Sequence, residues 1–237
     1  MTPYTDFCFP VRELSDGFVK LTPFDPTRHA APYFQGSKDH PELYSYMSIG
    51  PFATEQEFVS KFVDGFMSQP SVACYAVIDK TRPTSEADLE GELAGMVSYM
   101  SASAVHLSAE VGYIITLPPY QRTHVTTHAV GLLLHYALDT PEQGGLGLRR
   151  MQWLADPPNK ASLAAAQRMG FQLEGILRWN KVVPDAEARG KVHNGRERPS
   201  YGEVKDGGRD TAYLSLCWDE WIAGKREAVD MLLARHL

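Results

Sequence analysis

Apolar and polar residues follow two different periods along this chain. Alternation at every second residue, bounded by proline, glycine and polar turn residues, predicts strands. The expected strands cover residues 17–25, 71–79, 92–100, 109–116, 148–156, 171–183 and 209–218. Helical spacing predicts helices over 54–68, 122–138, 159–169 and about 218–236, and one or two short helices between 29 and 47 that are broken by Pro32, Gly36 and Pro41.

The order of these elements predicts an α/β (α+β) fold. Adjacent strands early in the chain favour hairpins, and the later strand-helix-strand units favour crossovers. We therefore expect a mixed, mostly antiparallel central sheet of about seven strands flanked by helices, in a single domain over residues 1–237. The charged stretch at 184–208 predicts a long loop, and its Arg189, Arg196 and Arg198 are most simply a solvated surface.

Composition narrows the range of partners. The formal charge of −6 gives no general electrostatic reason to bind nucleic acid or anionic lipid, and it suits an amine-bearing substrate better. Three distant cysteines, Cys8, Cys74 and Cys217, form no CxxC pair and indicate a reducing compartment. The first residues lack a basic and apolar leader, and no window approaches 18 apolar residues. We expect a cytoplasmic protein with no membrane partner.

The stretch "PPYQRTHVTTHAV", residues 118–130, joins a predicted strand to a predicted helix and contains no glycine. A strand, a tight loop and a helix N-terminus are the usual parts of an anion-binding cradle. Backbone N–H groups and the positive end of the helix dipole hold the anion, and any residue except proline supplies them. The alternative is a helix capped by threonine that binds no ligand.

Particular residues in two segments carry a family resemblance. The first segment, "EVGYIITLPPYQRTHVTTHAVGLLLHYAL", contains Gly112 and Tyr113 and a loop that resembles a "YQxTxVxTEA" pattern. The second, "NKASLAAAQRMGFQLEGILR", combines an N-x-x-S helix start at Asn159 and Ser162 with a GF pair and an EGxLR motif. Both resemble the acyl-CoA-binding motifs of the GNAT superfamily of N-acyltransferases, with the closer similarity to its RimJ/RimL-like branch. The resemblance extends from about Gly17 to Trp221.

The resemblance implies a GNAT-like fold, acetyl-CoA as co-substrate and specific roles for residues in both segments. It differs from the usual Q/R-x-x-G-x-G/A loop, because His124 and Thr126 occupy the two glycine positions. The expected cofactor-binding residues are Gln121, Arg122, Thr123, His124, Val125, Thr126, Thr127 and Asn159.

Ser162 is the implied general acid for the departing thiolate, and Glu110, directly or through a water, is the favoured base. Each of these residues also has a simpler interpretation. Asn159 and Ser162 suit helix capping, and Glu110 suits a solvated strand carboxylate.

His124, His128 and His135 lie on one face of the expected helix. An HxxxH pair can bind zinc, but no glutamate lies between the histidines and no third ligand has a clear spacing, so we expect no metal. His128 remains an alternative for a role near the cofactor or in proton transfer.

The acceptor is expected to contact the first helices and the long loop. Two interpretations remain open for a group of apolar residues in this region: they form an aromatic wall of the acceptor site, or they pack in the core. The residues are Tyr44, Tyr46, Met47 and Phe52. The function that the sequence favours is transfer of an acetyl group to a primary amine of a small molecule by a monomer or homodimer. A protein N-terminal acetyltransferase and a CoA-binding protein without turnover are the alternatives.

Overall fold

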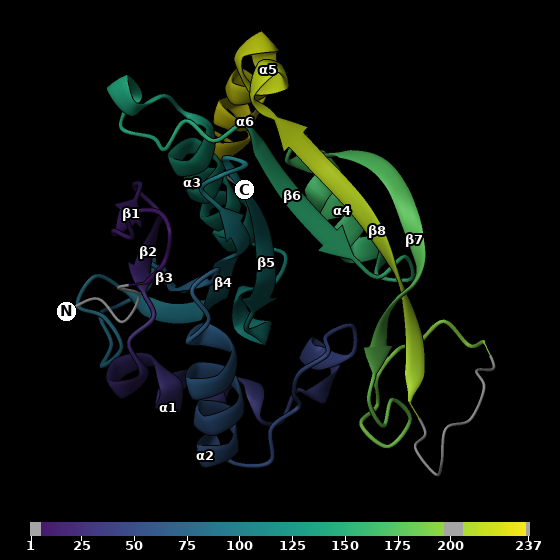
Figure 1. Ribbon diagram of the computed structural model, residues 1–237. Helices are drawn as coiled ribbons and strands as arrows, with labels where there is room; N and C mark the ends of the chain where they lie inside the picture. Colours follow the sequence, from purple (N-terminus) through teal and green to yellow (C-terminus); the bar gives the residue numbers. More distant parts are fainter. Residues whose placement is uncertain (1–5, 197–205, 236–237) are drawn as a thin grey trace.

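One eight-stranded sheet runs through the computed structural model, which describes residues 6–196 and 206–235. The strand order is β1-β2-β3-β4-β5-β6-β8-β7 (Figure 1). The strands are β1 (Leu14–Ser15), β2 (Val19–Pro23), β3 (Ala73–Asp79), β4 (Glu92–Ser103), β5 (Ser108–Thr116), β6 (Arg150–Ala155), β7 (Gln172–Val183) and β8 (Gly207–Cys217). The mixed, mostly antiparallel sheet confirms the predicted fold class, and the prediction omitted only the two-residue β1.

Within the described residues, six α-helical segments accompany the sheet. They are α1 (Pro26–Ser37), α2 (Glu55–Phe58), α3 (Val125–Leu138), α4 (Lys160–Arg168), α5 (Trp218–Glu220) and α6 (Arg226–Leu233). Short 3₁₀ segments cover Pro41–Tyr44, Pro118–Tyr120 and Pro141–Gln143, and π-helical segments cover Val59–Met67 and Trp221–Lys225. Helix α3 is the central helix, because it contacts strands from β1 to β6 and also helix α6. Its predicted core face, Val125, Ala129, Leu133 and Tyr136, is buried.

Strands β5 and β6 form the one parallel pair of the described sheet, and they stay together only briefly. Their register covers Ser108–Glu110 against Arg150–Gln152. Beyond that point β5 remains paired with β4 up to Thr116, and β6 remains paired with β8 up to Ala155. The sheet therefore splits into two halves that diverge from this short parallel contact (Figure 1).

Two helix predictions were wrong in detail. Helix α1 continues through Pro32 and Gly36, although an interior proline costs about 3 kcal/mol. Tyr33 and Phe34 beside Pro32 are buried, and packing of this face outweighs the lost backbone hydrogen bond.

The C-terminal helix predicted over 218–236 is interrupted at Gly224, which has a φ of +123°. Asp139 anchors the helical segments on both sides of this kink. It accepts hydrogen bonds from the indole of Trp221 and the guanidinium of Arg226, both at 2.9 Å. Residues His236 and Leu237 lie outside the described residues.

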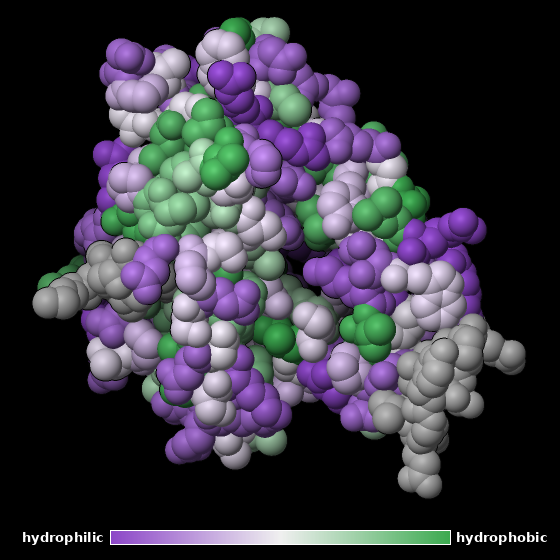
Figure 2. All heavy atoms as spheres, viewed as in Figure 1, coloured by the Kyte–Doolittle hydropathy of each residue, from purple (hydrophilic) through white to green (hydrophobic). Residues whose placement is uncertain are grey.

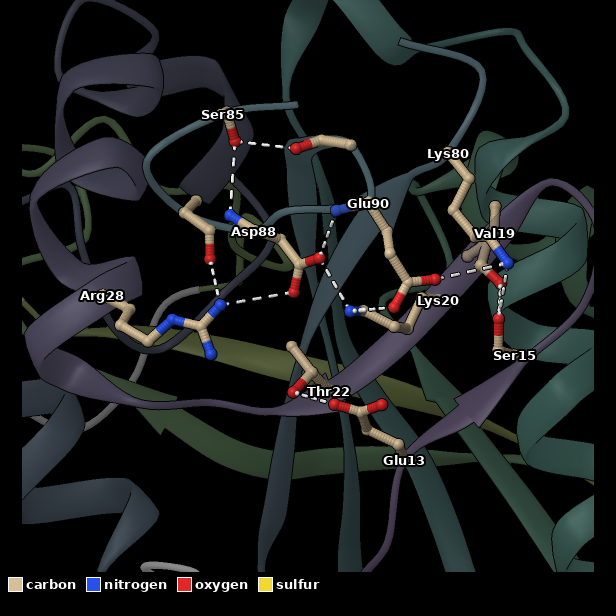
Figure 3. A network of polar contacts seen from close by, with 12 residues as sticks. Glu13, Ser15, Val19, Lys20, Thr22, Arg28, Lys80, Ser85, Asp88 and Glu90 are labelled. Carbon is tan, nitrogen blue, oxygen red and sulfur yellow. Dashed lines mark hydrogen bonds and ion pairs between the residues drawn. The ribbon is translucent and has the colours of Figure 1, made fainter. Parts of the chain in front are cut away.

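A buried ion network fastens the loop between β3 and β4 to the sheet (Figure 3). The Lys20 ammonium on β2 donates to Asp88 Oδ1 at 2.7 Å and to Glu90 Oε1 at 2.8 Å. Asp88 also accepts from the Glu90 backbone N–H at 2.8 Å and from Arg28 at 3.4 Å. Lys20 and Asp88 are 5% and 3% exposed, so neither charge is solvated by water. The network therefore joins β2 to the polar loop between β3 and β4.

Replacing Asp88 by asparagine should lower the free energy of unfolding by about 2 kcal/mol, because the buried Lys20 loses its charged partner while the side-chain volume is kept. The matched control is Glu90→Gln, which removes the half-exposed partner of the same lysine and should cost less than about 1 kcal/mol. Urea unfolding of the two variants measures the difference. Equal values for both would contradict a stabilising role for the buried pair.

Candidate active site

Two chambers meet where β5 and β6 diverge, and Figure 2 shows the surface hollowed between the two halves of the molecule. The larger chamber has a volume of about 850 Å³ and the smaller about 180 Å³. Both are lined by the same six residues, Leu43, Tyr46, Ile114, Trp153, Asn159 and Ser162. These residues mark the junction of a long cleft with a small side chamber. Asn159 and Ser162, which the sequence predicted as site residues, therefore lie at the junction.

The glycine-free loop lines the larger chamber, and its backbone conformation does not require glycine at either of the two positions where the usual motif has one. His124, at the first missing glycine, has a φ of −64°, and Thr126, at the second, lies in the first turn of α3. Neither position needs the conformational freedom of glycine. The one left-handed residue of the loop is Arg122, with a φ of +60°. Such a conformation costs a non-glycine residue about 1–2 kcal/mol.

Threonine side chains fix the shape of this loop. The Thr123 hydroxyl donates to the Tyr120 carbonyl at 2.6 Å and accepts from the Val125 N–H at 3.3 Å. The hydroxyls of Thr116 and Thr126 lie 2.8 Å apart and share a hydrogen bond. Residue His124 at the N-cap provides no side-chain cap for α3. The first-turn N–H groups of Thr126 and Thr127 are therefore free of intrahelical or capping partners, and both residues line the larger chamber.

The larger chamber is locally cationic although the chain is acidic. Arg122, Arg168 and Arg235 line it, and none of them forms an ion pair with a described residue. Among the described lining residues, Glu42 is the only carboxylate. Three free guanidinium groups and a helix N-terminus fit a ligand that carries several phosphates. The expected cofactor-binding residues Gln121 to Thr127 and Asn159 all border this chamber except Val125, whose side chain is buried in the core.

A proline at position 126 should weaken acetyl-CoA binding about 30-fold. It removes one N–H donor from the first helical turn, where proline is tolerated, and a hydrogen bond to a charged group contributes about 2 kcal/mol. Thr126→Ala is the matched control, since it keeps the N–H and removes only the hydroxyl bonded to Thr116. It should weaken binding by less than about fivefold. Isothermal titration measures both values. Equal affinities for the two variants would place the anion contacts elsewhere.

Ser162 lies at the junction with its oxygen already hydrogen-bonded. The Trp153 indole N–H donates to Ser162 Oγ at 2.9 Å, which leaves the hydroxyl proton of Ser162 free to be donated. The side chain of Asn159 accepts from the Ser162 backbone N–H at 3.1 Å and caps α4. The capping interpretation of Asn159 is therefore correct. The hydroxyl of Ser162 has no capping role, and Ser162 lines both chambers.

Glu110 is buried rather than solvated. It is 7% exposed, lines the smaller chamber and accepts a hydrogen bond from Ser101 Oγ at 3.2 Å. Burial raises the pKa of Glu110, although the charges of Lys181 and Arg209 act in the opposite direction. Gly112 makes room for this carboxylate, because a Cβ there would lie 2.3 Å from Met100 Sδ and 3.3 Å from Glu110 Oε1.

A bulge in β5 shapes the wall between the two chambers. The register with β4 shifts between Met96 and Ser98, and Tyr113 takes a φ of +46°. The stretch from Val111 to Thr116 has β4 on one side and no described strand on the side of β6. Backbone N–H groups on that side are free to contact a ligand at the junction. Strands β5 and β6 are thus splayed at this point.

The predicted aromatic wall divides into two groups. Tyr44 and Phe52 are buried core residues in edge-to-face contact, with ring centroids 5.5 Å apart. Tyr46 and Met47 line the smaller chamber. The wall interpretation fits only the second pair.

The described part of the long loop holds this wall in place. The Lys191 ammonium donates to the carbonyls of Tyr44 and Ile49 at 2.7 and 2.6 Å. Arg189 donates to the Gly50 carbonyl at 2.8 Å, so its interpretation as a solvated charge was wrong. Arg196 forms an ion pair with Asp210, and Arg198 lies outside the described residues. The loop therefore supports the segment that carries Tyr46 and Met47.

His124 at the N-cap of α3 and the two histidines within the helix contact different carboxylates. His124 Nε2 lies 3.3 Å from Asp79 Oδ1, and His128 Nδ1 lies 2.7 Å from Asp16 Oδ2. His135 contacts Asp139 and Asp230. Within residues 6–196 and 206–235, no group of three or more potential ligands is close enough to hold a metal ion. In the same ranges, no helix combines the length and apolar character that a membrane crossing requires.

Several lining residues were missed from the sequence. Arg168 and Arg235 border the larger chamber, and Asp156, Lys181 and Arg209 border the smaller one. Asp156 immediately follows β6, and its position before two prolines was the one local signal. The other residues come from β7, β8, α4 and the segment after α6, and no local sequence pattern connects them.

Comparison with known proteins identifies the family to which this chain belongs. Residues 19–172 match the model of the acetyltransferase (GNAT) domain, so the chain belongs to the GNAT family. A crystal structure of a GCN5-related N-acetyltransferase from Brucella melitensis superimposes with a TM-score of 0.73 at 27% identity, covering 94% of this chain and 86% of that one. A probable acetyltransferase from Chromobacterium violaceum gives a TM-score of 0.71 at 28% identity, covering 90% of both chains.

Similarity to a curated protein is more local. The spermidine N(1)-acetyltransferase of Escherichia coli K12 is 30% identical over 90 residues, which are 38% of this chain and 45% of that protein. The chain spans less than half the length of the curated relatives that it matches.

Proposed function

We propose that this protein is an acetyl-CoA-dependent N-acetyltransferase that acetylates a primary amine of a small molecule. The observation that carries the proposal is the junction of two chambers where β5 and β6 diverge, with Ser162 on one side and Glu110 in the smaller chamber. We place it, as one catalytic domain, nearest the RimJ/RimL-like branch, on the strength of the N-x-x-S, GF and EGxLR motifs.

The larger chamber supports binding of the CoA part. The N–H groups at the start of α3 would hold the pyrophosphate, and Arg122, Arg168 and Arg235 supply positive charge around it. Asn159, at the start of α4, would contact the pantetheine arm near the junction. The thioester when bound supplies an activated acetyl group. A free β5 N–H beside the Tyr113 bulge would polarise its carbonyl oxygen.

The residues at the junction supply the proton transfers. Glu110 would remove a proton from the amine, directly or through a water, as the nitrogen forms its bond to the acetyl carbon. The carbon–sulfur bond of the thioester breaks, and Ser162 would donate a proton to the departing thiolate. Glu110 then releases its proton to solvent and Ser162 regains one, so the products are an N-acetylated amine and CoA. Burial favours this use of Glu110, because a carboxylate with a raised pKa is a stronger base.

A small acceptor is favoured over a protein N-terminus. The smaller chamber, at about 180 Å³, lies below the roughly 300–1,000 Å³ of sites for drug-sized molecules. The local similarity to a spermidine N(1)-acetyltransferase also supports a small amine.

Release of CoA thiol from acetyl-CoA, measured across a panel of amino acids, amino sugars, polyamines and peptides, tests the proposal. We expect thiol release that depends on a small amine, with the acetylated amine identified by mass spectrometry. Acetylation of peptides alone would indicate the N-terminal acetyltransferase. Binding of CoA without turnover on any amine would indicate a protein that has lost catalysis.

A further inference from the structure

The smaller chamber contains unpaired charges of both signs. Glu110 and Asp156 provide two carboxylates, and Lys181 and Arg209 provide two cations. The charges of Lys181 and Arg209 both act on Glu110, and that of Arg209 acts on Asp156. Yet no ion pair joins any two of the four side chains. Opposite charges that are gathered in one chamber without pairing are available to a ligand.

The two cations face each other across neighbouring strands. Lys181 on β7 is the register partner of Arg209 on β8, and like charges directly opposite each other destabilise a sheet. Lys181 is exposed and lines the chamber. Arg209 is 9% exposed, and its buried Nε has no hydrogen-bond partner. Burying an unpaired guanidinium is costly, and an anion bound between the two side chains would offset both penalties.

The carboxylates line the same chamber from β5 and from the end of β6. Asp156 follows β6 and is 4% exposed, and its Oδ2 has no hydrogen-bond partner. Glu110 on β5 keeps one oxygen without a hydrogen bond, since Ser101 contacts only Oε2. These oxygens can accept hydrogen bonds from an amine that enters the chamber. Two cations and two carboxylates in one chamber together match a ligand that carries both an amine and an anion.

We propose that the acceptor is an amino carboxylate, a small molecule whose carboxylate binds Arg209 and Lys181 while its primary amine faces Glu110 and Asp156. This inference rests on the proposed acetyl transfer and names its substrate class. A polyamine fits this arrangement poorly, because a second ammonium would lie beside Arg209 and Lys181 with no anion to neutralise them. An arginine binds a carboxylate through two parallel hydrogen bonds, which would also fix the direction of the amine.

The test compares acceptors that differ only in charge. Thiol release from acetyl-CoA is measured with free amino acids, the corresponding amino acid amides and spermidine. We expect kcat/KM for the best free acid to exceed that for its amide about 100-fold, which corresponds to the loss of a buried charge-assisted contact. Amides or spermidine acetylated as well as the free acids would overturn the inference and leave acetyl transfer intact. Acetylation of peptides but not of free amino acids would overturn it as well.

The Arg209→Gln variant tests whether Arg209 itself binds the carboxylate of the acceptor. The preference for acid over amide should fall from about 100-fold to below about fivefold. Arg178→Gln is the matched control, since Arg178 is an exposed arginine of β7 outside the smaller chamber, and it should keep the preference. An unchanged preference in Arg209→Gln would contradict the assignment. The comparison of acid with amide in the unaltered protein stands even where Arg209→Gln fails to fold. Failure of every amine, with acetyl-CoA still bound, would instead refute the proposed function.

Discussion

Replacing Glu110 by glutamine is expected to lower kcat about 100-fold or more and to leave the Kd for acetyl-CoA within about twofold. A positioned general base contributes at least about 100-fold to proton transfer, and glutamine keeps the volume of the side chain without its basicity. Glu110 borders the smaller chamber and not the larger one, which explains why affinity for the CoA part should persist.

The pH dependence separates a catalytic from a structural role of Glu110. Its pKa lies above the ordinary 4.5 because of burial, so the catalytically active carboxylate forms only above that raised value. kcat/KM of the unaltered protein should therefore fall on acidification with an apparent pKa above 4.5. The Glu110→Gln variant should lack this acidic limb of the pH profile. Glu142→Gln, an exposed control, should keep it. A parallel acidic limb in the Glu110 variant would assign the base to another group.

Ser162→Ala is the second substitution with a large expected effect. It removes the hydroxyl proton at the junction, and kcat should fall about 100-fold, in line with the contribution of a general acid. The Kd for acetyl-CoA should stay within about threefold, because Asn159 still caps α4 through the backbone N–H of residue 162. Steady-state kinetics and isothermal titration separate the two effects.

Ser162→Thr provides the matched control for this substitution. It retains a hydroxyl that can accept from Trp153, so its kcat should stay well above that of Ser162→Ala. A large loss of acetyl-CoA affinity in Ser162→Ala with unchanged kcat would assign Ser162 to binding. That result would remove the proton donor from the proposed chemistry.

Local patterns determined most elements of the fold. The apolar face of α3 and the alternating strands were readable because each depends on side chains only a few residues apart. The turn at Gly224 and the continuation of α1 through Pro32 were not readable. In both cases tertiary contacts decide the outcome, through the Asp139 anchor of Trp221 and Arg226 and the burial of Tyr33 and Phe34.

Only part of the candidate site could be predicted from the sequence, because the rest depends on contacts between distant segments. Ser162 and Asn159 belong to one short motif, but the divergence of β5 from β6 depends on pairing between distant strands. The register that places Lys181 opposite Arg209 spans the long loop and has no local signal. Net charge gave no sign of the locally cationic chamber, because its three arginines come from a loop, α4 and the segment after α6.

A structure of the protein crystallised with CoA tests the central claim most directly. We expect the pyrophosphate within hydrogen-bonding distance of backbone N–H groups between residues 122 and 127. The CoA sulfur should lie at the junction, within reach of Ser162 Oγ. CoA bound with its sulfur away from the divergence of β5 and β6, or with its pyrophosphate away from the start of α3, would contradict the account.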